Sequence, residues 1–223
     1  MRHPFRMLPV ILLAAFACAG CGSPPSPAAK IAVPFTTQAP AGDWSEPWLD
    51  ACEETSIYMV SSFYADDTIT RDKAIARIKE ILAVKKDKLQ VSKDESLETI
   101  QKLIGDLGLP MLTRIVYDPT ADDLKNELTQ GRPIIVPVYG PALGSAVDGP
   151  DYHVLVLTGY DDPSGVFIVN DPGTKNGRGR RIPYATFMNA IHDLNAADYK
   201  AGKKAVLFTQ ENGLKAWFEA SSP

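Results

Sequence analysis

The first half of the chain carries apolar residues at helical spacing in three segments. These segments cover residues 51–65, 70–88 and 94–107. Apolar residues that recur every three or four positions form one face of a helix, so the pattern predicts three helices. Thr70 and Asp94 are expected to begin the second and the third of them, because short polar side chains cap helix starts.

The second half changes to short apolar runs bounded by turn residues, which is typical of strands. The runs cover residues 110–117, 132–139, 152–160, 165–171 and 203–210. A short helix is expected over 119–131, closed by Gly131, and another over 184–194. Helices first and mostly antiparallel strands afterwards predict an α+β domain, with the N-terminal helices packed on the sheet.

The N-terminus is typical of an export signal. Arg2 and Arg6 precede an apolar run, residues 8–19, that is too short to span a bilayer comfortably. The residues around Cys21 resemble the bacterial lipobox, which implies cleavage before Cys21 and a diacylglycerol on its sulfur. An ordinary secretory signal cut nearby is the alternative.

The chain is therefore expected to have three parts: a signal peptide over 1–20, a Pro-rich tether over 21–30 and one folded domain over 31–223. An apolar content of 45% with 22% charged residues suits a single domain with a sizeable core. The expected location is the bacterial cell envelope, on a membrane through the lipid at Cys21. The pattern does not distinguish the inner from the outer membrane.

Maturation changes both the cysteine count and the charge. If Cys18 leaves with the signal and Cys21 is lipidated, Cys52 remains as the only free thiol. Loss of Arg2 and Arg6 leaves 21 of the 23 basic residues against 27 acidic ones, a formal net charge of −6. No nucleic-acid partner is expected, because a surface that tracks phosphates needs a basic excess.

Cys52 lies where a helix is expected to begin. Asp50 and Glu53 have the spacing of a capping box, which would make Asp50 the N-cap. The positive end of the helix dipole would then lower the pKa of the thiol, whereas Glu53 and Glu54 would raise it. A catalytic role therefore requires a positive partner, and a small buried hydrophobic residue is the alternative.

The candidate partners lie on two runs that flank the turn "DDPSG". If this hairpin folds about Asp162, His153 faces Asp171 on the paired strand. Directly opposed side chains lie about 5 Å apart at Cβ, close enough for a carboxylate to orient an imidazole. A register slip of one residue would present Asn170 instead, so Asn170 and Asp171 both remain candidates.

Four stretches together resemble the bacteriocin-processing (double-glycine leader) cysteine peptidases, in the broad peptidase-like branch of the papain-like clan. They are "VPFTTQAP", "DACEETSIYMV", "YHVLVLTGYDD" and "VNDPG". The resemblance spans residues 33–210 and implies a papain-like fold. It also implies roles for four residues: Cys52 as nucleophile, His153 as base, Asp171 as orienting residue and Gln38 in the oxyanion hole.

Two features depart from this family or leave it open. Many members have Gly after the nucleophile, where this chain has Glu53. The Gln38 amide suits an oxyanion hole, but a surface-loop glutamine is the alternative. The basic stretch 175–181 is expected to be a solvated loop rather than a clamp for acidic substrates, and the Gly-rich stretch 140–151 a lid or an irregular loop.

The sequence thus predicts a lipid-anchored cysteine peptidase that cleaves a peptide or another amide bond of a peptide or protein substrate. A transamidase or acyltransferase is a close variant, because an amine could capture the acyl group. The alternative from another class is a non-catalytic module that binds peptides on the same fold. No cofactor is expected, and no metal, because no pair of closely spaced ligands is present. The oligomeric state is left open.

Overall fold

The computed structural model describes residues 26–90, 93–144 and 150–212. The predicted signal peptide, the lipidation site Cys21 and the first half of the predicted tether, 21–25, therefore lie outside the described residues. Within the described ranges, no helix combines the length and the apolar character needed to cross a membrane.

The helices of the first half lie where the apolar spacing predicts them. They are α1 (Cys52–Tyr64), α2 (Arg71–Val84), the π-helix η1 (Lys85–Leu89) and α3 (Leu97–Asp106). Thr70 caps α2 as predicted, since its hydroxyl accepts a hydrogen bond from the Lys73 N–H. The predicted start of α3 at Asp94 is wrong, because the hydroxyl of Ser96 caps this helix by accepting from the Thr99 N–H.

The strands form one antiparallel sheet with the order β2-β7-β3-β4-β5-β6, and β1 pairs with β4 beside this row. The strands are β1 (Ala28–Lys30), β2 (Met111–Tyr117), β3 (Ile134–Tyr139), β4 (Tyr152–Asp161), β5 (Val166–Asn170), β6 (Arg180–Pro183) and β7 (Ala205–Glu211). The remaining helices are α4 (Ala121–Thr129), α5 (Tyr184–Ala190) and two short 3-10 turns, η2 (Gly140–Leu143) and η3 (Tyr199–Ala201). The predicted α+β architecture is confirmed.

Three boundaries differ from the sequence prediction. Residues 28–30 of the predicted tether form β1, so the folded part begins before residue 31. Part of the predicted basic loop forms β6, which pairs with β5. The helix predicted to reach Leu194 ends at Ala190, because Ile191 is buried and forms a β-bridge with Val138.

The β4–β5 hairpin has a different register from the predicted one. Asp161 pairs with Val166 and Val156 pairs with Asn170, with an irregularity in the pairing between Leu157 and Gly159. The predicted direct opposition of His153 and Asp171 is therefore wrong. The turn is centred further along the chain than Asp162 and the pairing shifts within β4, so β5 ends before it reaches the level of His153.

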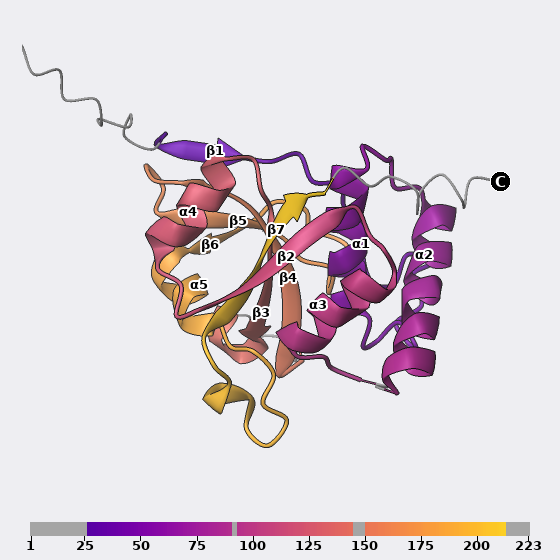
Figure 1. Cartoon of the computed structure of the whole chain (residues 1–223). Coiled ribbons are helices and arrows are strands. Elements are labelled where there is room, and N and C mark those ends of the chain that lie inside the picture. The colour runs from indigo at the N-terminus through magenta and orange to yellow at the C-terminus, as the bar shows by residue number, and fades with distance from the viewer. Residues whose placement is uncertain (1–25, 91–92, 145–149, 213–223) are drawn as a thin grey trace, which may run out of the picture.

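Helix α1 lies in the interior, between the sheet and α2 (Figure 1). Twelve of its thirteen residues are buried, which explains its serines and glutamates as well as its apolar side chains. Ser56 donates a hydrogen bond from Oγ to the Val154 carbonyl of β4 at 3.2 Å. This contact ties the first turns of α1 to the strand that carries His153.

A buried lysine joins α1 to the two elements that follow it. Lys85 Nζ pairs with Glu54 Oε1 at 2.6 Å, pairs with Glu95 Oε1 and donates to the Lys93 carbonyl at 3.1 Å. Burial favours the neutral amine, but the two carboxylates outweigh it and raise the pKa of Lys85 above its ordinary value. These ion pairs link α1, η1 and the segment before α3.

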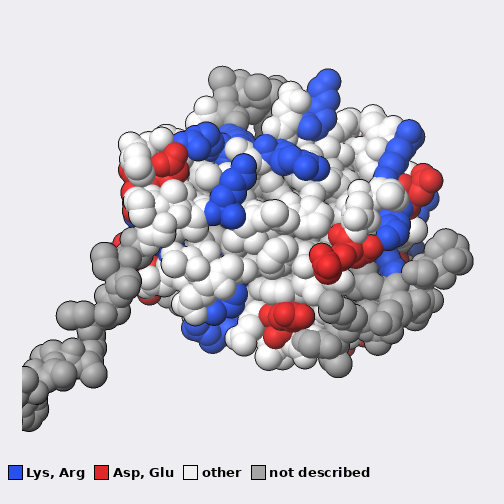
Figure 2. Space-filling view, turned by 90° about the horizontal axis from the view of Figure 1, so that it is seen from above, with Lys and Arg blue, Asp and Glu red and all other residues white. Residues whose placement is uncertain are grey.

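Surface charge is mixed. Basic and acidic side chains are both scattered over the face shown in Figure 2, and uncharged surface separates them. Among the described residues on this face, no continuous field of one sign is visible.

Replacing Lys85 tests how much its buried ion pairs with Glu54 and Glu95 stabilise the fold. Lys85→Met leaves two buried carboxylates without their partner, so we expect a loss of about 3–5 kcal/mol in the free energy of unfolding. Lys86→Met, at the exposed neighbouring position, is the matched control and is expected to stay within about 0.5 kcal/mol of wild type. Urea denaturation measures both, and equal stabilities for the two variants would contradict a structural role for the buried ion pairs.

Candidate active site

Cys52 is the first residue of α1, and the N-cap residue is Ala51. The predicted capping box of Asp50 and Glu53 is wrong, because no side chain caps this helix. The reason lies in Glu53, whose carboxylate turns into the protein: Oε1 accepts a hydrogen bond from the Glu95 N–H at 3.2 Å. That carboxylate is therefore unavailable to the backbone at the helix start.

The thiol of Cys52 is buried, with 4% of the residue exposed, and its Sγ donates to Glu53 Oε2 at 3.0 Å. Burial raises the pKa of Cys52 well above its ordinary value, and the negative charge of Glu53 raises it further. A backbone N–H bond from Val154 acts in the opposite direction. The helix dipole is expected to lower the pKa of Cys52, and the two glutamates to raise it. In this structure burial and the adjacent carboxylate dominate, so the lowered pKa is wrong.

His153 and Asp171 are in contact despite the unexpected register. His153 Nε2 lies 2.8 Å from Asp171 Oδ1. Asp171 also accepts from the Gly173 N–H at 2.9 Å and from Arg180 Nη1 at 2.8 Å. Burial alone would raise the pKa of Asp171, but these donors together lower it to about 2, so the group is a carboxylate at neutral pH.

The turn after β5 accounts for this contact. The Asp171 N–H donates to the Gly177 carbonyl, which brings residues 171–177 back on themselves. A Cβ atom at Gly173 would lie 2.9 Å from His153 Cε1 and 3.0 Å from Nε2. Because real Cβ contacts are not this short, only glycine lets the turn lie against the imidazole.

Asn170, the other candidate for the third position, has different partners. Its Nδ2 donates to the Val33 carbonyl at 3.2 Å, and its Oδ1 accepts from the Gly179 N–H at 3.1 Å. Asn170 therefore fixes the backbone on both sides of β5, while Asp171 contacts the imidazole.

The second ring nitrogen of His153 is available. His153 Nδ1 is buried and has no hydrogen-bond partner among the described residues. The backbone N–H of the next residue, Val154, acts on the sulfur of Cys52 by lowering the pKa of the thiol. The structure thus places the thiol against the backbone of the strand that carries the histidine, but the S–H of Cys52 is directed to Glu53.

Gln38 lies between the segment before Cys52 and the turn after β5. Its Nε2 donates to the carbonyls of Trp48 at 3.0 Å and Leu49 at 2.6 Å, and its backbone N–H donates to Pro172 O at 3.0 Å. Both amide hydrogens are used in these bonds. Donation to an oxyanion therefore requires at least one of them to be released.

The four predicted residues form a closed site. Their exposed fractions are 4% for Gln38, Cys52 and Asp171 and 5% for His153. Two surface pockets, of about 310 and 500 Å³, share Arg132 and Gln210 in their lining and include none of these four residues. Access to Cys52 therefore requires its covering residues to move.

Two tryptophans lie in the segment before Cys52: Trp48 is buried, whereas Trp44 is 39% exposed. Arg180 contacts Asp171 and Arg181 pairs with Asp161, so these two cations of the basic stretch hold carboxylates of the protein itself.

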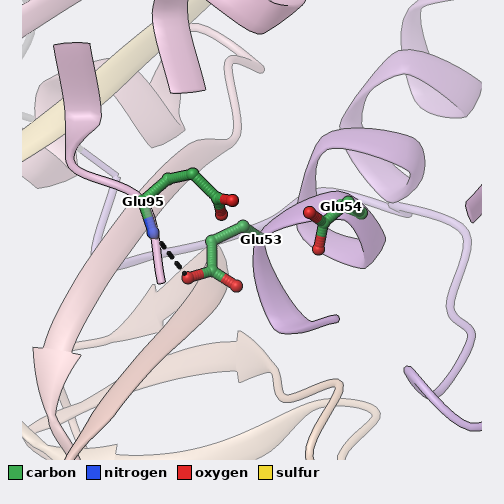
Figure 3. Close-up of side chains that lie close together, drawn as sticks. All are labelled: Glu53, Glu54 and Glu95. Atoms are coloured by element: carbon green, nitrogen blue, oxygen red, sulfur yellow. Dashed lines mark hydrogen bonds between the residues drawn. The ribbon is translucent and has the colours of Figure 1, made fainter. Parts of the chain in front are cut away.

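A buried group of carboxylates next to Cys52 is the main feature that sequence reasoning missed. Glu53, Glu54 and Glu95 place carboxylate oxygens within 4.8 Å of one another (Figure 3). The Lys85 ammonium contacts two of these carboxylates and supplies the positive charge that a metal ion would bring. One signal was readable: Lys85 continues the spacing of the buried apolar positions 74, 78 and 81 of α2.

Helices packed on an antiparallel sheet, with a cysteine at a helix start and a histidine on a strand, define a papain-like α+β fold. The sequence profile of the Peptidase_C39 like family matches residues 30–201. The chain therefore belongs to this family. A Bacillus anthracis protein described as a C39-like peptidase has a similar crystal structure, with a TM-score of 0.51 and 15% identity over 82% of this chain and 98% of that one. No curated protein matches the chain at a significant level.

The lowered pKa of Asp171 predicts how stability depends on pH. The folded pKa, about 2, lies below the ordinary value of about 3.9. Asp171 therefore stabilises the protein above about pH 4, and this contribution of about 2 kcal/mol is lost as the pH falls to about 2.

The comparison variant is Asp171→Asn, which removes the titrating group. Urea denaturation between pH 5 and pH 2 should show wild type losing about 2 kcal/mol more than the variant over this window. The remaining acidic groups are common to both proteins and cancel in the difference. Parallel stability curves would contradict the role of Asp171 as a strongly held carboxylate.

Proposed function

We propose that this protein is a cysteine peptidase that hydrolyses a peptide or another amide bond with Cys52, His153 and Asp171. One observation carries the proposal. The carboxylate of Asp171 holds one imidazole nitrogen, the other nitrogen has no partner among the described residues, and the only free thiol of the described chain lies on α1, which Ser56 ties to the adjacent residue Val154. Family membership and fold agree with a peptidase-like protein.

The geometry indicates which atoms of His153 and Cys52 hold and receive the protons. In the neutral imidazole of His153, Nε2 carries the hydrogen that the Asp171 carboxylate accepts, and Nδ1 keeps its lone pair. Nδ1 accepts the proton of Cys52, and the thiolate attacks the carbonyl carbon of the substrate. The imidazolium then returns this proton to the leaving amine, and water hydrolyses the thioester that remains.

Stabilisation of the oxyanion is assigned to two donors. The Cys52 N–H lies at the start of α1, where backbone N–H groups have no partner within the helix. The Gln38 amide is the second donor once it leaves the Trp48 or the Leu49 carbonyl. Binding of substrate in the closed site would have to supply this change.

The same site supports two other candidate functions. Capture of the thioester by an amine instead of water would make the protein a transamidase or acyltransferase. A non-catalytic peptide-binding module is the second candidate, and the raised pKa of Cys52 together with the occupied Gln38 amide favours it.

The proposed setting is the bacterial cell envelope, with the protein held on a membrane by a lipid at Cys21. Its support is the N-terminal charge and apolar pattern and the small residues before Cys21. A peptide or protein at that membrane would be the substrate.

Cleavage of a mixed peptide library tests the proposal. Mass spectrometry should show new termini with wild type, none with Cys52→Ala, and rates reduced at least about 100-fold with His153→Ala. His192→Ala is the matched control, because His192 lies outside this site and its Nδ1 contacts the Ala190 carbonyl. Cleavage that survives Cys52→Ala would overturn the proposal. Peptides retained but never cleaved by wild type would support the binding module.

A further inference from the structure

Glu53 is the carboxylate in direct contact with the proposed nucleophile. It is fully buried, its Oε2 accepts from Cys52 Sγ at 3.0 Å, and its Oε1 is fixed by the Glu95 N–H at 3.2 Å. Figure 3 shows Glu53 held in this way from the Glu95 backbone. Both oxygens of the carboxylate are thus held by hydrogen bonds, and Oε2 lies against the sulfur.

The neighbouring lysine does not pair with Glu53. The ion pairs of Lys85 within the described residues go to Glu54 and Glu95. Glu53 therefore has the Cys52 thiol and a backbone N–H as its hydrogen-bond partners, and no cation of the described part of the chain forms an ion pair with it. An ionised carboxylate at such a position is costly unless a proton is shared with it.

The groups around Glu53 come from every element packed against it. They are Cys52 and Glu54 of α1, Lys85 of η1, Glu95 before α3, and Tyr152 of β4. The group contains three carboxylates, those of Glu53, Glu54 and Glu95, and one ammonium, that of Lys85. Burial and Glu54 accordingly raise the pKa of Glu53 to about 8, and burial and the other glutamates raise that of Glu95 to about 10.

We propose that Glu53 is a second proton acceptor for the Cys52 thiol, so that the nucleophile divides its proton between Glu53 and His153. The inference rests on the proposed function, because it assigns Cys52 as the nucleophile. In the step itself the S–H bond breaks and an O–H bond forms on Oε2. The pair passes from thiol and carboxylate to thiolate and carboxylic acid, with no change in total charge.

This exchange has a specific effect on reactivity. The form with thiol and carboxylate is unreactive toward electrophiles, and the tautomer with thiolate and carboxylic acid is reactive. The two forms hold the same number of protons, so their ratio does not depend on pH. The reactive fraction therefore rises as the pair loses its first proton, becomes constant, and rises again only when the second proton leaves.

The experiment is the rate of Cys52 alkylation by iodoacetamide against pH in the full-length protein. Wild type should show two steps, the first with an apparent pKa near 8. Glu53→Gln keeps the shape of the side chain, and its carbonyl still accepts the Glu95 N–H. It should show a single step and react at least about 10-fold faster at pH 9, where Glu53 of wild type is ionised and its negative charge opposes the thiolate.

Glu98→Gln is the matched control, since Glu98 is also an acidic residue in the first turn of a helix but is exposed and bonded to Tyr117. It should reproduce the wild-type curve. The wild-type curve alone tests the inference if Glu53→Gln does not fold, because a single step in wild type overturns it. Identical curves for wild type and folded Glu53→Gln overturn it as well.

Peptide cleavage separates this inference from the proposed function. If wild type cleaves peptides through Cys52 and Glu53→Gln leaves the alkylation curve unchanged, the peptidase stands and the role of Glu53 falls. If the curve changes as expected and no peptide is cleaved by wild type, the shared proton stands and the peptidase falls.

Discussion

The contact of α1 with a single residue of β4, Val154, determines the rest of the site. The Val154 N–H lowers the pKa of the Cys52 thiol, and the Val154 carbonyl accepts a hydrogen bond from Ser56, one turn further along α1. Because His153 precedes Val154, this one contact fixes the helix start next to the histidine. The remaining features either hold α1 in this place or prepare the imidazole that lies beside it.

Two sets of charges act on this site in opposite directions. On the imidazole side, Asp171 is kept ionised by His153, Gly173 and Arg180, and its carboxylate orients the ring. On the helix side, Glu53 lies against the thiol and opposes the thiolate. The closed structure is thus one in which the thiol keeps its proton, and a substrate must change the balance between the two sides.

The elements of the fold were predictable because each follows from local pattern. The apolar spacing and caps of α2, and the alternation of short apolar runs with turns, depend on neighbouring residues only. The association of His153 with Asp171 was also predicted, although for the wrong register. It forms because the turn at Gly173 and Gly177 brings Asp171 back to the imidazole, a shape that strand pairing alone does not indicate.

What could not be predicted depends on contacts between distant segments. The inward turn of Glu53 requires the Glu95 backbone, 42 positions away, and its charge depends on how Lys85 is shared. The Gln38 amide likewise donates both of its hydrogens to carbonyls of the segment before Cys52. Sequence reasoning identified the residue types at the site, but their protonation follows from burial, which only the assembled fold defines.

The central claim is that the Cys52 sulfur forms a covalent bond with an acyl group. The most direct test is intact-protein mass spectrometry after rapid acid quenching of the protein mixed with the peptides that it cleaves. We expect an adduct with the mass of one peptide fragment, mapped to Cys52 and absent from Cys52→Ala. Peptide turnover without any adduct on Cys52, or with an adduct at another residue, would contradict it.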